Sequence, residues 1–276
     1  MFKLKNSFLG FLSLVVLFSL SHPSTVSAVD RVSYLYTEEN VKIGVGSPKV
    51  TFKSAKINEN LNAYTFQTVK NDEGIIQTIS INPPTFSPTI EIPVKFQNEE
   101  NLILYQDNLG KAYNAGNIHN KNHKSIGIFS VQVINNEGKA NITSRIKDGN
   151  TLIVNVDKKN PLEPLTIIVE ITASTFSTYF SEMKWINRGG IESLSLAQKP
   201  YLTNASDAGV ERVKKIDAWE KVASIHSSNT KWSNTNGMRN QFDCHFDFAK
   251  NKDSWNLEPH RPNVDYLSTV IAKCNP

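Results

Sequence analysis

Residues 237–249 read Gly237-Met238-Arg239-Asn240-Gln241-Phe242-Asp243-Cys244-His245-Phe246-Asp247-Phe248-Ala249, and this stretch decides the expected fold of the C-terminal part of the chain. From Gln241 to Phe248, polar and apolar residues alternate, which predicts a β-strand with one buried face. Its apolar face carries Phe242, Cys244, Phe246 and Phe248. Its polar face carries Gln241, Asp243, His245 and Asp247. In a strand, neighbouring residues on this face would be about 7 Å apart.

A helix is predicted after this strand, beginning near Pro262 or Asn263. Its apolar residues recur at helical spacing, at Val264, Leu267, Ile271 and Cys274. Cys244 and Cys274 are the two cysteines of the chain, and each falls on the apolar face of its predicted element. The pattern therefore predicts a disulfide between strand and helix in the core. No Cys-x-x-Cys spacing is present, which argues against a redox pair.

Two further elements complete the predicted C-terminal domain. Residues 183–186 and 191–196 form a hairpin around Gly189-Gly190, because glycines suit a turn that needs positive φ. Residues 204–207 supply capping residues for a helix that runs to about His226. Its apolar positions repeat at every third residue and predict an amphipathic helix on a sheet: Val210, Val213, Ile216, Trp219 and Val222.

The front of the chain predicts an antiparallel β module, because strand-sized runs are separated by turn residues and no helical period lies between them. The runs are 50–55, 64–69, 75–81, 90–96, 102–105, 126–134, 151–156 and 165–171. His119 and His123 lie in an Asn- and Lys-rich loop of this module. They lack the further ligands that a zinc site needs.

The first 28 residues predict a signal peptide. Lys3 and Lys5 precede an apolar run from Phe8 to Leu20, and Val26-Ser27-Ala28 fits the cleavage rule. The apolar run is short for a membrane span, and no second one follows, so we expect a secreted, extracellular protein without a transmembrane helix after cleavage. With Lys3 and Lys5 removed from the 30 basic residues, 28 remain against 26 acidic residues. This near-equal charge balance is not the strongly basic composition that is typical of a nucleic-acid-binding protein, so it gives no strong indication of one.

The expected fold class is therefore α+β, with a mainly antiparallel β module followed by a small disulfide-stapled α+β domain. The expected division is a signal peptide at 1–28, a β-rich module at 29–178 and a C-terminal domain at 179–276. A disulfide agrees with export, because disulfides persist in oxidising compartments.

The C-terminal part also holds the candidate site. His245, with Arg239, Glu258 and Arg261, could form an acid–base site with cationic help for a phosphoryl or glycosyl transition state. The polar strand face could bind a divalent metal, or could simply face solvent. The candidate binding residues are Asp243, Asp247, Trp255, Asn256 and His260. No motif specifies a cofactor, and we assign no metal.

The front module resembles a β-rich module that precedes varied C-terminal domains in secreted proteins of Gram-positive bacteria. The resemblance rests on residues 101–110, Ile128-Phe129, residues 149–153 and residues 161–171. It implies a presentation or folding module.

The C-terminal part resembles a domain of unknown function of secreted Gram-positive proteins. The motifs that carry the resemblance are Arg239-x-Gln241-x-x-Cys244-His245-x-Asp247-x-Ala249, Trp255-Asn256-Leu257-Glu258-Pro259-x-Arg261-Pro262 and Cys274-Asn275-Pro276. Relatives often carry Trp at the position of His260. This makes Arg239, His245, Glu258 and Arg261 the stronger candidates for a catalytic role. The family implies no activity.

Three function classes remain open. The first is a binding module with an unknown envelope or extracellular partner, which we favour. The second is an effector or hydrolase that acts on a polyanion or cell-wall polymer through His245, Arg239, Glu258 and Arg261. The third is an inhibitor or immunity-type partner of a secreted enzyme.

Overall fold

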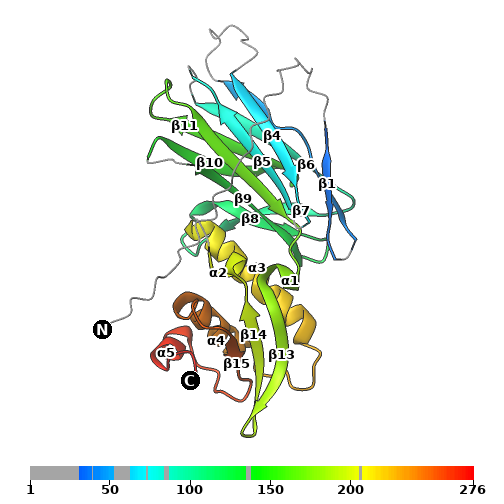
Figure 1. Cartoon of the computed structure of the whole chain (residues 1–276), viewed down its shortest axis with the longest axis vertical. Coiled ribbons are helices and arrows are strands. Elements are labelled where there is room, and N and C mark those ends of the chain that lie inside the picture. Colours follow the sequence, from blue (N-terminus) through cyan, green and yellow to red (C-terminus); the bar gives the residue numbers. More distant parts are fainter. Residues whose placement is uncertain are drawn as a thin grey trace, which may run out of the picture.

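The computed structural model describes residues 31–38, 40–52, 63–72, 74–83, 87–134, 138–204 and 207–276. The predicted signal peptide lies outside these residues. The described chain is rich in β-structure, with three antiparallel sheets and a few helices (Figure 1). No helix in the described ranges is long and apolar enough to cross a membrane.

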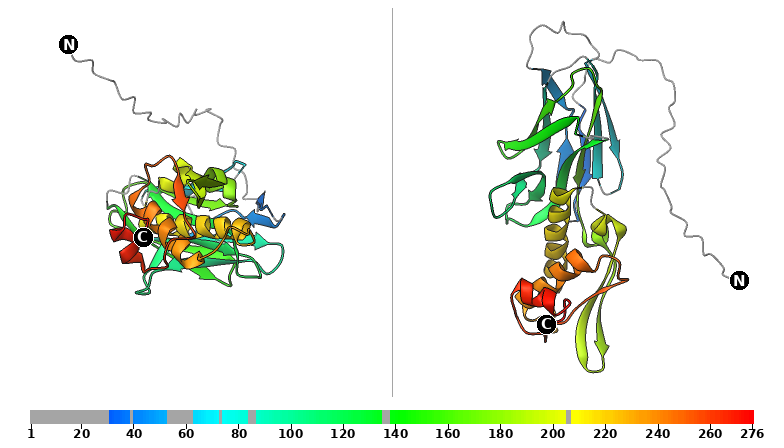
Figure 2. Two further views of the ribbon diagram at one scale, coloured as in Figure 1. Left: turned by 90° about the horizontal axis from the view of Figure 1, so that it is seen from below. Right: turned by 90° about the vertical axis from the view of Figure 1, so that its left-hand side faces the viewer.

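Two sheets face each other and form a sandwich (Figure 2). The first follows the order β1-β2-β6-β11-β10, with β3 also paired to β6. Its strands are β1 (Ser33–Tyr36), β2 (Lys42–Val45), β3 (Lys49–Phe52), β6 (Pro88–Phe96), β10 (Ala140–Lys147) and β11 (Thr151–Lys158). The second follows the order β4-β5-β12-β9-β8-β7. Its strands are β4 (Tyr64–Lys70), β5 (Gly74–Ile81), β7 (Asn101–Gln106), β8 (Ala112–His119), β9 (Ser125–Ile134) and β12 (Leu165–Thr172).

Alternating apolar residues of both sheets fill the space between them. Ile90, Ile92 and Val94 point inward from β6, and Ile167 and Val169 point inward from β12. All of them are at most 2% exposed. This burial of β-branched side chains is the main force that holds the sandwich together.

The predicted β-rich front is therefore confirmed, although the sequence prediction missed four of its strands. The missed strands are β1, β2, β8 and β10. The first two are only four residues long, and β8 and β10 contain mostly small or polar residues, so the hydrophobic period is weak there. His119 ends β8, whereas His123 lies in the following turn with a φ of 59°. Residues 53–55 of the first predicted strand lie outside the described ranges.

The C-terminal part begins after a short helix, α1 (Phe176–Tyr179), which leads directly into the third sheet. The predicted hairpin is confirmed as β13 (Phe180–Arg188) and β14 (Ile191–Gln198), and its turn places Gly189 and Gly190 at φ values of 61° and 91°. A third strand, β15 (Trp255–Leu257), pairs with β14. The sequence analysis assigned no strand to residues 255–262, so this strand is an addition.

Helix α3 (Ala208–His226) confirms the predicted helix, with Asp207 as its capping residue, but its predicted amphipathic character is wrong. A short helix, α2 (Pro200–Thr203), precedes it. The arrangement differs from a helix laid on one sheet, because Lys214, Lys215 and Asp217 are buried as well. The helix is covered on two sides: Val210 and Val213 pack against Ala115 and Ile128 of the sandwich. Trp219 and Val222 instead enter the C-terminal core. Figure 1 shows α3 running from the sandwich into the C-terminal part.

The strand predicted for residues 241–248 is wrong, because this segment is helix α4 (Thr235–Phe248). The strict alternation over residues 241–248 fits a strand, but the four-residue spacing of Phe242 and Phe246 also fits one face of a helix. Phe242 and Phe246 are one helical turn apart and both are fully buried, whereas Phe248, which a strand would bury, is 66% exposed. The Asn234 side chain caps the helix by accepting a hydrogen bond from the Gly237 amide.

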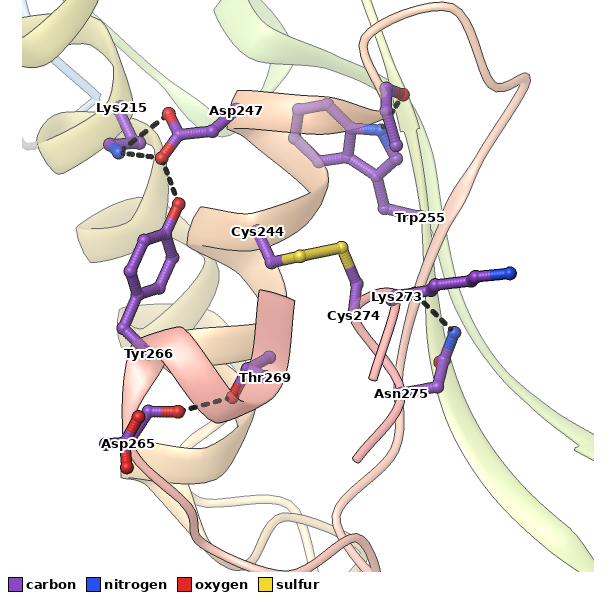
Figure 3. The surroundings of a disulfide bond; sticks show 11 residues. Lys215, Cys244, Asp247, Trp255, Asp265, Tyr266, Thr269, Lys273, Cys274 and Asn275 are labelled. Atoms are coloured by element: carbon purple, nitrogen blue, oxygen red, sulfur yellow. Dashed lines mark hydrogen bonds and ion pairs between the residues drawn. A yellow bond between two sulfur atoms is a disulfide. The ribbon is translucent and has the colours of Figure 1, made fainter. Parts of the chain in front are cut away.

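The disulfide between Cys244 and Cys274 is confirmed, but its setting differs from the prediction. It joins α4 to the turn that follows helix α5 (Tyr266–Ile271), so it does not join a strand to a helix (Figure 3). The predicted apolar stripe of the last helix is also wrong, since Leu267 and Ile271 are 68% and 74% exposed. Helix α5 contains only six residues, and Thr269 is its buried member.

Replacing both cysteines by alanine is expected to lower the free energy of unfolding of the C-terminal part by about 3 kcal/mol. The two residues are 30 positions apart and buried, so the bond restricts a long loop in the unfolded chain. Urea unfolding followed by tryptophan fluorescence measures the effect. The parent chain should become as unstable as the variant when a reductant is added, and the variant should not respond. Equal stability of the two oxidised proteins would contradict the prediction.

Candidate functional site

Glu258 lies at the centre of the predicted site and is only 4% exposed. Its Oε2 accepts a hydrogen bond of 2.6 Å from Arg261 Nε, and its Oε1 accepts one of 2.9 Å from Arg188. Ser193 donates a third hydrogen bond, of 3.3 Å, to Oε1. Burial raises the pKa of this carboxyl, but Arg261, Arg188 and His260 outweigh it and lower the pKa overall. Glu258 is therefore an ionised carboxylate already satisfied by the protein.

The side chains of Arg261 and Gln241 also form hydrogen bonds with backbone groups in this region. Arg261 donates from Nη1 to the carbonyls of Asn275 and Pro276, at 3.3 and 3.2 Å. Gln241, which is fully buried, donates to the carbonyl of Glu258 and accepts from its amide. We call the group of Glu258, Arg261 and Gln241 the C-terminal clamp, because it ties α4, β15 and the last residues together.

His245 faces the core and not a predicted polar strand face. It is 3% exposed, and its ring lies parallel to that of Trp255, with centroids 6.4 Å apart. Burial and the charge of Lys252 lower the pKa of His245 to about 4, against smaller opposite effects of the Asn256 backbone and Glu258. The imidazole is therefore neutral at physiological pH.

The carboxylates Asp243 and Asp247 are paired on α4. Arg239 Nε donates to Asp243 at 2.8 Å, and its guanidinium lies over the Trp219 ring. Asp247 accepts two hydrogen bonds of 3.0 Å from Lys215 and one from the Tyr266 hydroxyl. Figure 3 shows the Lys215 and Tyr266 side chains both directed at Asp247. The Arg239–Asp243 pair lies within α4, whereas Asp247 links α4 to Lys215 of α3 and to Tyr266 of α5.

The other predicted binding residues are divided between core and surface. Trp255 is fully buried and donates its indole N–H to the carbonyl of Ala249. Asn256 is half-buried on β15, and His260 is exposed. The structure thus brings Glu258, Arg261, His245 and His260 into electrostatic range, and leaves Arg239 with Asp243 and Trp219. Within the described ranges, no group of three or more His, Cys, Asp or Glu side chains is placed to hold a metal ion.

A cavity of about 410 Å³ lies elsewhere, where the sandwich meets α3, and we call it the junction cleft. Four segments form it: the two residues after β1, the turn before β9 with the first two residues of β9, Ser174, and the second half of α3 with Ser227 after it. Its lining residues are Thr37, Glu38, His123, Lys124, Ser125, Ile126, Ser174, Trp219, Glu220, Lys221, Ala223, Ser224 and Ser227. The volume falls within the range of about 300–1,000 Å³ that small-molecule sites occupy.

The wall of the junction cleft is held by bonds between α3 and Ser125. Glu220 accepts a hydrogen bond of 3.2 Å from the Ser125 amide, and Lys221 donates one of 2.6 Å to the Ser125 carbonyl. Lys221 also lies 3.7 Å from Asp217, which is fully buried and accepts a hydrogen bond of 2.6 Å from Tyr179. Burial raises the pKa of Glu220, against the lowering effect of the Ser125 amide.

Sequence reasoning missed the junction cleft because its residues come from distant segments. Trp219 was assigned only to an apolar helix face, and His123 only to a solvated loop. One signal was present in the sequence. Asp217 lies four residues after the apolar Val213, so the two side chains share a face of the helix. A carboxylate at such a position indicates a polar environment inside the fold.

Replacing Arg261 by methionine is expected to lower the free energy of unfolding by about 3 kcal/mol, because the buried Glu258 carboxylate loses its closest partner. The matched control is Arg188→Met, which removes a partner that is 53% exposed and should cost less than about 1 kcal/mol. Urea unfolding measures both variants. Adding Glu258→Gln to Arg261→Met should restore part of the loss, whereas equal effects of the two arginine variants would contradict the clamp.

Stability should fall as the pH drops from about 6.5 towards 4, because the unfolded state then binds a proton at His245 that the folded state does not. The lowered pKa corresponds to about 3 kcal/mol at most. Urea unfolding at pH 7.5 and pH 4.5 measures the change, and His245→Asn serves as the control. The difference between the parent and this variant isolates His245 from the carboxylates, and identical pH dependence of the two would overturn the assignment.

Comparison with known proteins finds relatives without an assigned activity. The uncharacterized proteins Mb0487 of Mycobacterium bovis and Rv0477 of Mycobacterium tuberculosis are each 41% identical over 63 residues, which is 21% of this chain. The match spans 40% of the length of each of these relatives. A crystal structure of heparinase III aligns with 61% of this chain and 26% of its own, at 13% identity and a TM-score of 0.27.

The C-terminal part matches a family model. Residues 180–276 match the model described as "Protein of unknown function (DUF2599)". The match begins at the first residue of β13 and includes α3, the clamp and both cysteines. This part of the chain is therefore a C-terminal domain of unknown function.

Proposed function

We propose that this protein is an exported binding protein that acts outside the cell or in the cell envelope and holds its ligand in the junction cleft. The observation that carries the proposal is the cleft itself, in which four segments gather hydroxyl, charged and aromatic side chains around about 410 Å³. Concave sites with a few convergent polar groups are the usual form of a ligand site. The predicted signal peptide and the disulfide support export.

The state of the predicted catalytic residues also supports a binding role. Glu258 and Arg261 are engaged by internal hydrogen bonds, and Arg239 is paired with Asp243. His245 is 3% exposed, so its ring is shielded from a bound substrate. A general acid or base must come within hydrogen-bond reach of its substrate. The rival proposal, an effector or hydrolase that uses these four residues, requires this region to open first.

Sedimentation with insoluble cell-envelope polymer tests the proposal, using the chain without residues 1–28. The parent protein should sediment with the polymer and should release no soluble fragments. Ser224→Trp places a large side chain in the cleft from an exposed position on α3, so we expect about tenfold less bound protein. The matched control is Ser228→Trp, at an exposed residue outside the lining, which should sediment like the parent.

Two results would contradict the proposal. Equal sedimentation of Ser224→Trp and the parent would move the contact away from the cleft. If the parent released soluble fragments and a folded Arg239→Ala variant did not, the protein would be a hydrolase instead.

A further inference from the structure

We infer that strand β4 pairs antiparallel with β4 of a second copy of this chain, so that the two sandwiches share one continuous sheet. β4 is an edge strand, because it pairs only with β5 among the described strands. An edge strand exposes unpaired N–H and C=O groups that can bind another strand. The inference goes beyond the proposed function, since β4 contributes no residue to the junction cleft.

The other edge strands of the described chain carry at least one of the features by which natural sheets prevent such pairing. β1, β3 and β15 contain only three or four residues each. β10 and β13 carry charged side chains within the strand, and a bulge interrupts β7. β4 differs from all of them. Its seven residues pair with β5 in one unbroken register, they include no proline, and the one charged residue, Lys70, stands at the end of the strand.

The hydrogen bonds at the two ends of β4 show which of its backbone groups face the free edge. The Asn82 amide donates to the Ala63 carbonyl at 2.9 Å, and the Asn71 amide donates to the Gly74 carbonyl at 3.0 Å. Because hydrogen-bonded and non-hydrogen-bonded pairs alternate along an antiparallel ladder, the odd-numbered residues of β4 bond to β5. The even-numbered residues direct their N–H and C=O groups to the free edge, where no hydrogen bond within the described ranges engages them: Tyr64, Phe66, Thr68 and Lys70.

One antiparallel register pairs the whole length of β4 with a second copy of itself. The opposite residues are then Gln67 with Gln67, Phe66 with Thr68, Thr65 with Val69 and Tyr64 with Lys70. The residues with free backbone groups meet only one another in this register, so each of their pairs can exchange two hydrogen bonds. The two lysines lie at opposite ends of the paired strands, each beside a tyrosine ring that can bind the cation. β4 is therefore complementary to a second β4 in both hydrogen bonding and charge.

The exposure of Phe66 also favours a further strand at this edge. Phe66 lies opposite Ile79 of β5, so the two side chains share a face of the sheet. Ile79 is fully buried, whereas Phe66 is 36% exposed, which shows that the cover over this face ends at β4. In the proposed register Thr68 of the second copy lies directly beside Phe66. The two phenylalanines lie diagonally, about 7–8 Å apart, within reach of aromatic side chains. Pairing removes this apolar surface from water.

Sedimentation velocity on the chain without residues 1–28 tests the inference. The concentration series extends to the millimolar range, because interfaces below about 1,200 Å² are typically weak. The parent should form a dimer. Gln67→Lys and Gln67→Glu each place two like charges opposite each other, and each should raise the dimer dissociation constant by about fivefold. An equimolar mixture of these two variants should restore the dimer, because the opposite charges then attract. The matched control is Gln106→Lys, at an exposed residue of the β7 edge, which should dimerise like the parent.

A cross-link reports the register of the pairing. Both native cysteines are joined in a disulfide, so a cysteine introduced into β4 is a free thiol. Gln67→Cys should form a covalent dimer under mild oxidation, because the Cα atoms of a non-hydrogen-bonded pair are about 4.5 Å apart, within the range of a disulfide. The matched control is Thr65→Cys, at an exposed residue of the same strand. Its two thiols would lie about 13 Å apart along the paired strands and should not cross-link.

Three results would overturn the inference. If the parent stays monomeric and Gln67→Cys forms no covalent dimer, the edge of β4 is left to another extended segment. A dimer that Gln67→Lys leaves unchanged would be formed through a different surface. Equal cross-linking of Thr65→Cys and Gln67→Cys would contradict the register. Ser224→Trp should dimerise like the parent, so the dimer and the cleft are tested separately. Melting temperatures of the variants near that of the parent confirm that they are folded.

Discussion

The contact between α3 and the sandwich is the constraint on which the rest of the structure depends. Ser125 begins β9 beside an irregular pairing with β8, and both of its backbone groups are bound by neighbouring side chains of α3, Glu220 and Lys221. Val210 and Val213 of the same helix complete a small core with the sandwich, while Trp219 enters the C-terminal core. One helix therefore belongs to two cores, and the position of each part of the molecule follows from it.

The C-terminal motifs have a structural explanation in this framework. Gln241, Glu258 and Arg261 form the clamp, and Cys244 and Cys274 join α4 to the end of the chain. Trp255 fills the core between α4 and the sheet. A small domain with a short three-stranded sheet has little apolar area to bury, so charge-assisted hydrogen bonds and a disulfide supply much of its specificity. This accounts for a dense signature of polar residues that presents few free groups to solvent.

The junction cleft owes its chemistry to the same contact. The sandwich contributes loop residues, α3 contributes Trp219, Glu220 and Lys221, and the connection after β12 contributes Ser174. Clefts between structural units are frequent ligand sites, because rigid elements on both sides hold side chains contributed by loops. A ligand bound here, as proposed, would contact both parts of the molecule, and its binding energy would then also stabilise their relative position.

The sequence by itself determined the β-rich front, the hairpin, the α3 helix and the pairing of the cysteines. Each of these depends on a local period, a turn glycine or a simple count of thiols. Only the tertiary structure decided that residues 241–248 are helical, because an eight-residue alternation also fits a helix whose Phe242 and Phe246 share a face. The tertiary structure also decided that His245 is buried and that the Glu258 carboxylate is fully hydrogen-bonded within the protein. Both depend on the pairing of β15 with β14. The junction cleft was beyond sequence reasoning for the same physical reason: its side chains converge only because α3 packs against two units at once.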